Sequence, residues 1–407
     1  MNAPHLPNDE LGEPRIETLA IHAGADVDPQ TRASSPNLTM SATFLPRELT
    51  GFSALDEDAS AGYIYARSGN PTVTQLEERL AALEGAEAAR CFASGIAATH
   101  AVIMGRLSAG DHVIFPETTY SGTAEFIRNS LPRFGIRTSF VDATDPTMVA
   151  KAITPETRML WLETPCNPTL QLCDIRALSA LAHGRGIRDV VVDSTFASPV
   201  ATRPIDLGAD FVVHSLTKYI GGHGDAMGGA VLGRRAEIEA LNMEAAVHFG
   251  GVLSPFNAWL IQRGVETLPI RMRAHQEGAL AVAQFLEAHP AVSRVYYPGL
   301  PSHPQHDLAR QQMANFSGML TFQTQEDGAA IAARMVENLR YVHFAVSLGH
   351  TRSLIYWIGT DDILASTYQH QAGAEARFRA LLGPGIFRLS VGLEAADDVC
   401  ADLARCL

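Results

Sequence analysis

The sequence is poor in basic charge and in long apolar runs, and each shortage narrows the range of possible functions. It has 31 Lys and Arg against 44 Asp and Glu, which gives a net charge of −13. Because a phosphate backbone is bound by a basic face, nucleic acid is not expected as a partner. No apolar run approaches the roughly 18 residues that span a bilayer, so a membrane partner is not expected either.

Cysteine is scarce as well, with five residues and no CxxC pair among them. An odd number without paired spacing indicates reduced thiols and argues against a disulfide framework or a zinc site. The first residues (MNAPH) contain neither a basic segment nor an apolar one, so no secretion signal is expected. We therefore expect a cytoplasmic protein without a metal site.

Several common catalytic motifs are also missing. The sequence contains no GxxxxGKS or GxxxxGKT phosphate loop, no HExxH zinc motif and no GxSxG nucleophile elbow. Its glycines at positions 222, 224 and 228 miss the dinucleotide-binding spacing, and they follow a lysine-containing segment instead of opening a strand-helix unit. Nucleotide binding, zinc-dependent hydrolysis and serine hydrolysis are therefore not indicated.

What the sequence does contain is an alternation of short apolar runs with amphipathic helices. Asn70 followed by Pro71 predicts a helix start, and Gly85 predicts its end. Five β-branched, apolar runs without polar alternation predict strands buried on both faces: residues 112–115, 138–141, 159–162, 190–192 and 211–213. Strands that alternate with helices predict a parallel α/β sheet, which binds ligands beyond the carboxyl ends of its strands.

Composition and apolar patterning along the sequence predict three parts. Residues 1–62 are rich in Pro, Asn, Asp, Ser and Gly, and we expect an arm that packs on another surface. Residues 63–262 hold the predicted sheet. Residues 263–407 begin within a long helix (254–275, interrupted at Pro269) and continue with strand candidates at 292–295, 318–322 and 387–391. They predict a smaller C-terminal α/β domain.

Polar side chains follow the predicted strands at the edge where their carboxyl ends meet. They occupy positions 117–120, 163–168, 193–195 and 215–218. Lys218 stands between Thr217 and a glycine-rich segment, which suits covalent attachment of a cofactor aldehyde. The alternative is a solvated surface lysine, which is the usual fate of a lysine after a strand.

Pyridoxal 5'-phosphate (PLP) accounts for several of these residues together. Lys218 would bind its aldehyde, Asp193 at a strand end would face the pyridine nitrogen, and Tyr120 would stack on the ring. Thr195, two residues after Asp193, is also predicted to bind the cofactor. The alternatives are a helix cap for Asp193 and an ordinary interface tyrosine for Tyr120.

The phosphate and the substrate have candidates too. A helix that begins at Ser94, Gly95 and Ile96 would offer free backbone N–H groups to the phosphate. The alternative is that Ser94 only caps the helix. Further hydroxyl donors are Ser215 and Thr217. Arg388 would pair with a substrate carboxylate, or form a surface ion pair. Asn167 would bind the ring oxygen or the substrate, or serve a turn.

These residues occur in segments that resemble the Cys/Met-metabolism family of PLP-dependent enzymes, which includes cystathionine γ-synthase, cystathionine lyases, methionine γ-lyase and O-acylhomoserine sulfhydrylases. The resemblance covers nearly the whole chain. It is carried by the segments 215–223 (SLTKYIGGH), 193–196 (DSTF), 65–72 (YARSGNPT), 163–168 (ETPCNP), 254–256 (SPF) and 388–392 (RLSVG).

The resemblance implies a fold-type-I transferase architecture, with a large mixed, mostly parallel sheet domain that binds PLP. It also implies a homotetramer of two close dimers with shared active sites, in which Tyr65 and Arg67 reach the phosphate of the neighbouring subunit. By the same resemblance, Lys218 moves the Cα and Cβ protons and Tyr120 acts as acid and base near the leaving group. Ser347 and Arg388 hold the substrate.

The resemblance is less uniform where substrates are selected. Val346 precedes Ser347-Leu348-Gly349, as in methionine γ-lyases, and is assigned to the substrate. Gly122 stands where those lyases have cysteine, and residues 350–360 depart from the family pattern. We expect γ-elimination from a γ-substituted L-amino acid such as methionine, homocysteine, an O-substituted homoserine or canavanine. The alternatives are γ-replacement, by a cystathionine γ-synthase or an O-acylhomoserine sulfhydrylase, and a non-catalytic scaffold.

Overall fold

A computed structural model describes residues 14–25, 27–28, 31–46, 62–366 and 374–407. The described residues form two compact units. The first contains the residues up to Arg106 together with Phe211–Ile270, and the second contains Leu107–Asp210 together with Arg271–Leu407. The three-part division at 62/63 and 262/263 stays a prediction, and much of the expected arm (residues 1–13 and 47–61) lies outside the described residues.

The first unit is built on three antiparallel strands. The strand β7 (Gly229–Gly233) pairs with both β1 (Ala88–Phe92) and β6 (Phe211–Ser215). The helices of this unit are α1 (Ile16–His22), α2 (Pro71–Glu84), α3 (Gly95–Arg106), α8 (Arg235–Leu241) and α9 (Pro255–Glu266), with a π-helical segment η5 (Asn242–His248).

Helix α2 begins and ends where the sequence predicts. The Asn70 side chain accepts a hydrogen bond from Thr72 N at 2.9 Å, and Pro71 occupies the first helical position. Gly85 ends the helix in the left-handed region, with a φ of 72° that glycine adopts without steric cost. The local signals thus suffice to fix this element.

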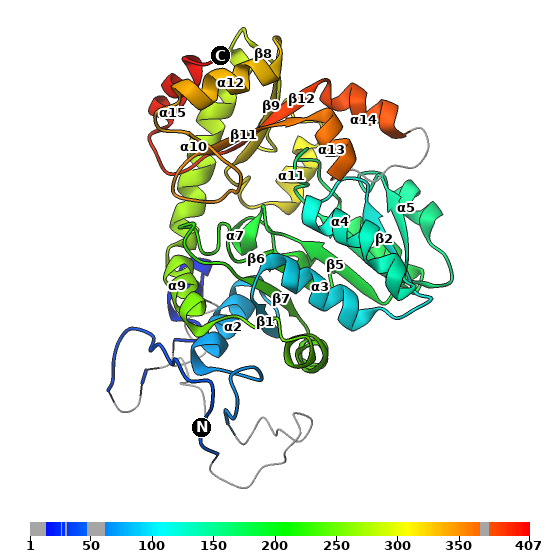
Figure 1. The fold of residues 1–407 in the computed structure, drawn as a ribbon, viewed down its shortest axis with the longest axis vertical. Helices are drawn as coiled ribbons and strands as arrows, with labels where there is room; N and C mark the ends of the chain where they lie inside the picture. Colours follow the sequence, from blue (N-terminus) through cyan, green and yellow to red (C-terminus); the bar gives the residue numbers. More distant parts are fainter. Residues whose placement is uncertain (1–13, 26, 29–30, 47–61, 367–373) are drawn as a thin grey trace. The chain divides into compact units, whose positions relative to one another are not determined.

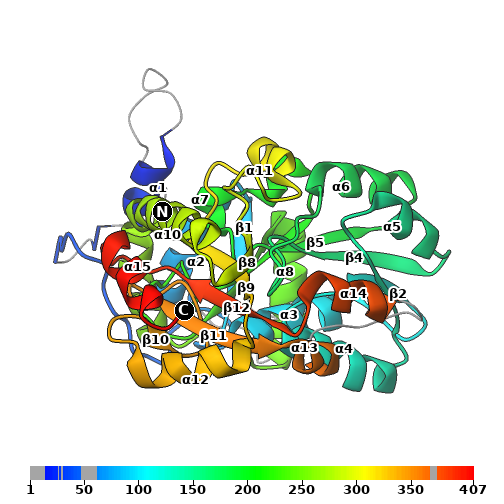
Figure 2. The same ribbon diagram turned by 90° about the horizontal axis from the view of Figure 1, so that it is seen from above.

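The second unit contains the parallel strands of the large sheet. These are β2 (His112–Pro116), β3 (Arg137–Val141), β4 (Thr157–Glu163) and β5 (Asp189–Asp193), paired in the order β5-β4-β2-β3. Between and after them lie α4 (Ser121–Asn129), η3 (Leu131–Phe134), α5 (Pro146–Ala152), α6 (Ile175–Gly184), α7 (Ser198–Ala201) and η4 (Pro204–Leu207). Helices α5 and α6 lie beside β4 and β5 (Figure 2), and all four elements share one apolar core.

The seven strands follow one sheet order, β1-β7-β6-β5-β4-β2-β3, and include both parallel and antiparallel pairs. The predicted large mixed sheet is therefore confirmed. All five predicted strands are present, each one to three residues longer than its apolar run.

A five-stranded sheet fills the C-terminal part of the second unit. Its order is β10-β11-β12-β9-β8, and only β10 and β11 pair in parallel. The strands are β8 (Val292–Tyr296), β9 (Met319–Thr324), β10 (His343–Phe344), β11 (Leu354–Gly359) and β12 (Gly385–Ser390). The helices are α10 (Leu268–Ala288), α11 (His306–Gln312), α12 (Gly328–Asn338), α13 (Thr360–Ser366), α14 (Ala374–Leu382) and α15 (Ala396–Ala404). Helices α10, α12 and α15 pack beside this sheet around one core (Figure 1), which confirms the smaller α/β domain.

Some elements were not predicted from the sequence. Strand β1 contains Arg90, which is buried beside Glu77 (Nη1 to Oε1 3.5 Å) and breaks the apolar pattern. Strand β7 begins and ends in glycine, which usually weakens a strand. Helix α1 lies within the expected arm. The interruption expected at Pro269 falls at Thr267, between α9 and α10.

Within the part of the chain that the structure describes, every helix is too short or too polar to cross a bilayer.

Candidate active site

The lysine predicted to bind the cofactor lies in a tight loop after β6. Lys218 N donates to Ser215 O at 3.2 Å, and Gly222 N donates to Lys218 O at 2.7 Å. Leu216 N donates to Gly228 O at 2.9 Å and ties the start of the loop to its end. Lys218 is half-buried, so its backbone position is fixed while its side chain belongs to a partly shielded site.

Thr217 closes the same loop with its hydroxyl group. Its Oγ1 accepts from Gly228 N at 3.1 Å and lies 3.3 Å from Gly228 O, to which it donates. The hydroxyl of Thr217 thus has a structural role that was not predicted, while its contact with the phosphate stays a prediction.

Close glycine packing places the start of α3 against β6 and β7. A Cβ atom on Gly95 would lie 2.8 Å from Ser215 Cβ, and one on Gly229 would lie 2.1 Å from Ser94 O. Ser94 Oγ accepts from Ala97 N at 3.2 Å, so Ser94 caps this helix, and its contact with a phosphate stays a prediction. The first backbone N–H groups of α3, including that of Ile96, have no carbonyl acceptor in a preceding helical turn. Such a helix start suits an anion, and the residues present fit the phosphate of PLP.

Tyr65 and Arg67 form a pair in the first unit. The guanidinium carbon of Arg67 lies 5.6 Å from the ring centre of Tyr65, and Arg67 Nη1 donates to Val247 O of η5 at 2.6 Å. Arg67 is exposed and so is 45% of Tyr65. An exposed arginine over a tyrosine ring is chemically suited to bind an anion.

In the second unit, Tyr120 precedes α4 and leaves 46% of its surface exposed. Its backbone N donates to Glu163 Oε2 at 2.8 Å, and the hydroxyl of Thr119 donates to the same oxygen at 2.5 Å. Asn167 N donates to Glu163 Oε1 at 2.8 Å. A buried carboxylate at the end of β4 thus holds two loops that carry predicted site residues. Sequence reasoning assigned no role to Glu163, although its strand-end position marked the segment.

Asp193 ends β5 directly beside Glu163 in the parallel register. Its Oδ1 accepts from Thr195 N at 3.0 Å, so Thr195 is held at the predicted carboxylate. Burial and the neighbouring charge of Asp193 together raise the pKa of Glu163 to about 8, against the lowering effect of its three donors. The carboxylate of Asp193 beside this buried group favours a cationic partner, and the protonated pyridine nitrogen of PLP is chemically such a partner.

Arg388 on β12 gathers the other predicted substrate residues of the second unit. Its Nη1 donates to Asn167 Oδ1 at 3.0 Å and its Nη2 to Ser347 O at 3.4 Å. Ser347 has a φ of 91°, an uncommon value for a residue with a side chain and one that clusters at functional sites. Its Oγ lies 3.2 Å from His350 Nε2. Val346 is 64% exposed beside this group.

The predicted site residues are divided between the two units. The first unit holds Tyr65, Arg67, Ser94, Gly95, Ile96, Ser215, Thr217 and Lys218, and the second holds Tyr120, Asn167, Asp193, Thr195, Val346, Ser347 and Arg388.

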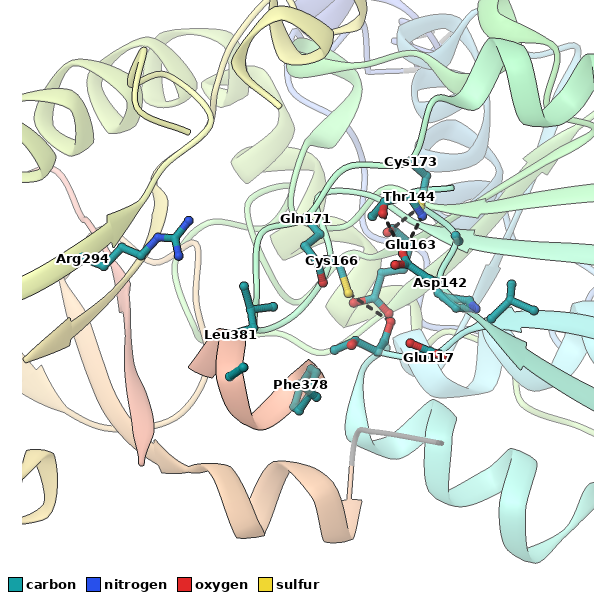
Figure 3. A pocket seen from close by; sticks show the side chains of 15 residues that line it. Glu117, Asp142, Thr144, Glu163, Cys166, Gln171, Cys173, Arg294, Phe378 and Leu381 are labelled. Atoms are coloured by element: carbon teal, nitrogen blue, oxygen red, sulfur yellow. Dashed lines mark hydrogen bonds between the residues drawn. The ribbon is translucent and has the colours of Figure 1, made fainter. Parts of the chain in front are cut away.

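A cavity of about 380 Å³ opens in the second unit next to Glu163. Figure 3 shows Glu163, Cys166 and Asp142 near one another, with Phe378 and Leu381 of α14 also in its lining. Cys166 Sγ donates to Thr118 O at 3.0 Å, and burial raises the pKa of this thiol. Among the described residues, no cluster of three or more His, Cys, Asp or Glu is arranged to hold a metal ion.

Comparison with known proteins gives relatives along nearly the whole chain. The chain is 40% identical to an L-methionine gamma-lyase of Porphyromonas gingivalis, over 98% of both proteins. It is 41% identical to a canavanine gamma-lyase of Pseudomonas canavaninivorans, over 96% of this chain and 95% of that protein. It is also 41% identical to a cystathionine gamma-synthase of Mycobacterium tuberculosis, over 99% of this chain and 100% of that protein.

Solved structures agree with these relatives. The crystal structure of metB from Corynebacterium glutamicum has a TM-score of 0.86 and 35% identity, over 97% of this chain and 98% of that one. A cystathionine gamma-lyase from Lactobacillus plantarum, complexed with L-serine, has a TM-score of 0.85 and 37% identity, over 96% and 98%. The fold-type-I architecture, the PLP cofactor and the γ-lyase or γ-replacement chemistry are thereby confirmed. The family model of Cys/Met metabolism PLP-dependent enzymes matches residues 17–407, and the chain belongs to that family.

Proposed function

We propose that this enzyme catalyses γ-elimination from a γ-substituted L-amino acid, such as methionine, homocysteine, an O-substituted homoserine or canavanine. The observation that carries this choice is Val346, which precedes Ser347 and is 64% exposed at the group around Arg388. The similarity to γ-lyases over nearly the full length supports it. An apolar side chain there favours a substrate whose γ-substituent does not end in a charged amino acid group.

Each residue of the site has a proposed task. Lys218 binds the cofactor's aldehyde and afterwards moves protons at the substrate Cα and Cβ. Tyr120 stacks on the ring, and its hydroxyl gives a proton to the departing γ-substituent. Arg388, with Asn167 and Ser347, binds the α-carboxylate. The residues proposed to hold PLP are Tyr65, Arg67, Ser94, Gly95, Ile96, Asp193, Thr195, Ser215 and Thr217.

When bound, PLP supplies an electron sink for the charge that develops at the substrate Cα. The bond from Cγ to its substituent breaks, and the substituent leaves with a proton. Water then releases the remaining carbon chain as 2-oxobutanoate together with ammonia. For methionine the departing group is a thiol, and for an O-substituted homoserine it is an acid or an alcohol.

A second candidate is γ-replacement, in which a thiol takes the place of the departing group. Its support is a 39% identical O-succinylhomoserine sulfhydrylase of Pseudomonas aeruginosa, over 98% of this chain and 96% of that protein. Gly122 and residues 350–360 depart from the methionine γ-lyase pattern, which favours a polar or O-linked γ-substituent in either reaction.

A substrate screen separates the two reactions. The purified holoenzyme is incubated with methionine, homocysteine, cystathionine, O-acetylhomoserine, O-succinylhomoserine and canavanine, each with and without a thiol, while 2-oxobutanoate and ammonia are measured. We expect the oxoacid in the absence of thiol. A product that forms only with thiol identifies γ-replacement, and Lys218→Ala, as the inactive control, should lose both turnover and the visible absorption band of the bound cofactor.

We also propose that the chain works in the cytoplasm as a homotetramer, a dimer of dimers, without nucleic acid or membrane partners. All five cysteines are unpaired thiols, as suits a reducing compartment. Apolar side chains exposed on the first unit support contacts with other copies: Met40, Met227, Phe249 and Phe256. The exposed Tyr65 and Arg67 would then reach the phosphate bound by the neighbouring subunit.

A further inference from the structure

We propose that Glu163 is a positioning residue, whose carboxylate sets the places of Tyr120 and Asn167 relative to each other. This proposal deepens the function given above and rests on it. The residue contacts neither substrate nor cofactor in this role, since its effect passes through the two loops that it binds.

The side chain of Glu163 binds the loops that follow two neighbouring strands. It is the last residue of β4, 5% exposed, and β4 pairs in parallel with β2. The loop after β2 supplies Thr119 and Tyr120 as donors to Oε2, and the loop after β4 supplies Asn167 as a donor to Oε1. Both oxygens are therefore used, one for each loop.

The link continues beyond Asn167 to the proposed carboxylate site. The backbone N of Asn167 is bound by Glu163, while its side-chain Oδ1 accepts from Arg388 Nη1 at 3.0 Å. A displacement of Asn167 would therefore move the acceptor that orients the guanidinium. Tyr120 at one end and Arg388 at the other are thus connected through a single buried carboxylate.

Three donors explain why a carboxylate occupies this position in spite of its cost. Burial and the neighbouring Asp193 both act against charge on Glu163 and raise its pKa. In its ionised form the carboxyl group can nevertheless accept all three hydrogen bonds, because it then has acceptor sites and no donor. A glutamine would turn an NH₂ group toward at least one N–H or O–H donor and leave a buried donor unmatched.

The test compares Glu163→Gln with Asp142→Asn, which makes the same carboxyl-to-amide change at another residue of the same cavity. Both hydrogen bonds that Thr144 gives to Asp142 end on Oδ1, at 3.1 Å and 2.6 Å, and an asparagine oxygen can keep them. Holoenzyme is assayed for kcat and KM, and cofactor content and melting temperature are measured.

We expect Glu163→Gln to keep its cofactor and its absorption band but to lose between about 5-fold and 100-fold in kcat/KM, as one unmatched buried donor would cause. Asp142→Asn should match the wild type. A variant with a lower melting temperature but wild-type kcat and KM per bound cofactor would overturn the proposal, because Glu163 would then be only structural.

Thr119→Val keeps the proposal testable where Glu163→Gln fails to fold. It removes one donor, leaves the carboxylate in place and should lower kcat/KM by a smaller factor, whereas unchanged kcat/KM counts against the role of Glu163. A second measurement is the affinity for an unreactive amino acid, obtained by titrating it into the holoenzyme and following the absorption of the bound cofactor. This measurement does not depend on γ-elimination. Weaker amino-acid binding by Glu163→Gln would therefore support the positioning role even if the wild type catalyses no γ-elimination.

Discussion

Arg388 and Asn167 share a hydrogen bond of 3.0 Å although 221 positions separate them in the chain. Arg388 lies on β12 of the five-stranded sheet, whereas Asn167 follows β4 of the seven-stranded sheet. The amide oxygen holds one edge of the guanidinium and the carbonyl of Ser347 holds another. The arginine is thereby pre-organised, so that less side-chain freedom is lost when a carboxylate binds.

Arg388→Lys tests this arrangement. A lysine keeps the charge but loses the planar fork that can meet a carboxylate and Asn167 together. We expect KM for the amino acid to rise about tenfold or more while kcat falls less, because the reacting groups remain in place. Steady-state kinetics provide the measurement, with Arg310→Lys on the exposed surface of α11 as a control. Equal kinetics for both variants would show that Arg388 does not bind the carboxylate.

The glycine packing at the start of α3 gives a second prediction. Gly95→Ala places a Cβ atom 2.8 Å from Ser215 Cβ, so either the helix start or the end of β6 must shift. We expect a higher dissociation constant for PLP, measured by titration of the apoenzyme. Gly184→Ala is the matched control, since nothing lies within 4 Å of its added Cβ. If Gly95→Ala binds PLP as tightly as the control does, the helix start is not the phosphate site.

Mixed oligomers test the shared active sites. Arg67→Ala and Lys218→Ala should each be nearly inactive alone, one through weak cofactor binding and the other through loss of the covalent attachment. If Arg67 serves the neighbouring subunit, a mixed dimer contains one site with both residues intact. We therefore expect activity to return in part when the two variants are unfolded, mixed and refolded together. Mixtures that stay inactive would place Arg67 and Lys218 in the same subunit's site.

His275 on α10 predicts how stability depends on pH. It is fully buried, and its Nδ1 lies 2.8 Å from Val391 O. Burial lowers its pKa to about 4 from an ordinary value of 6.5, helped by Arg271. Between pH 6.5 and 4 the unfolded chain therefore binds a proton that the folded one excludes, and the free energy of unfolding falls as the pH drops, by roughly 3 kcal/mol at most.

His275→Asn removes this titration while leaving an amide donor near Val391 O. The variant should lose less of its melting temperature between pH 7 and pH 5 than the wild type does. Thermal melts of both holoenzymes at several pH values provide the comparison. Parallel curves over that range would mean that His275 does not set the acid sensitivity.

Much of this fold follows from local signals. Apolar, β-branched runs were sufficient for β2 to β6, because strands buried on both faces leave little room for polar residues. Strands β1 and β7 were not predicted from the sequence. Arg90 interrupts the apolar pattern of β1 and is explained only by its contact with Glu77, and the glycines at both ends of β7 are typical of loops. The site residues could be proposed because a cofactor requires particular side chains after particular strands.

The family and the cofactor could be predicted from the sequence alone, and so could the segments proposed to carry the chemistry, because these predictions depend on residue type and short spacing. Tertiary structure decided how the segments are held. Glu163 gathers Tyr120 and Asn167, Asn167 holds Arg388, and Gly95 meets Ser215, all through contacts between residues far apart in the chain. Such contacts depend on strand register and on close packing, which no local pattern encodes.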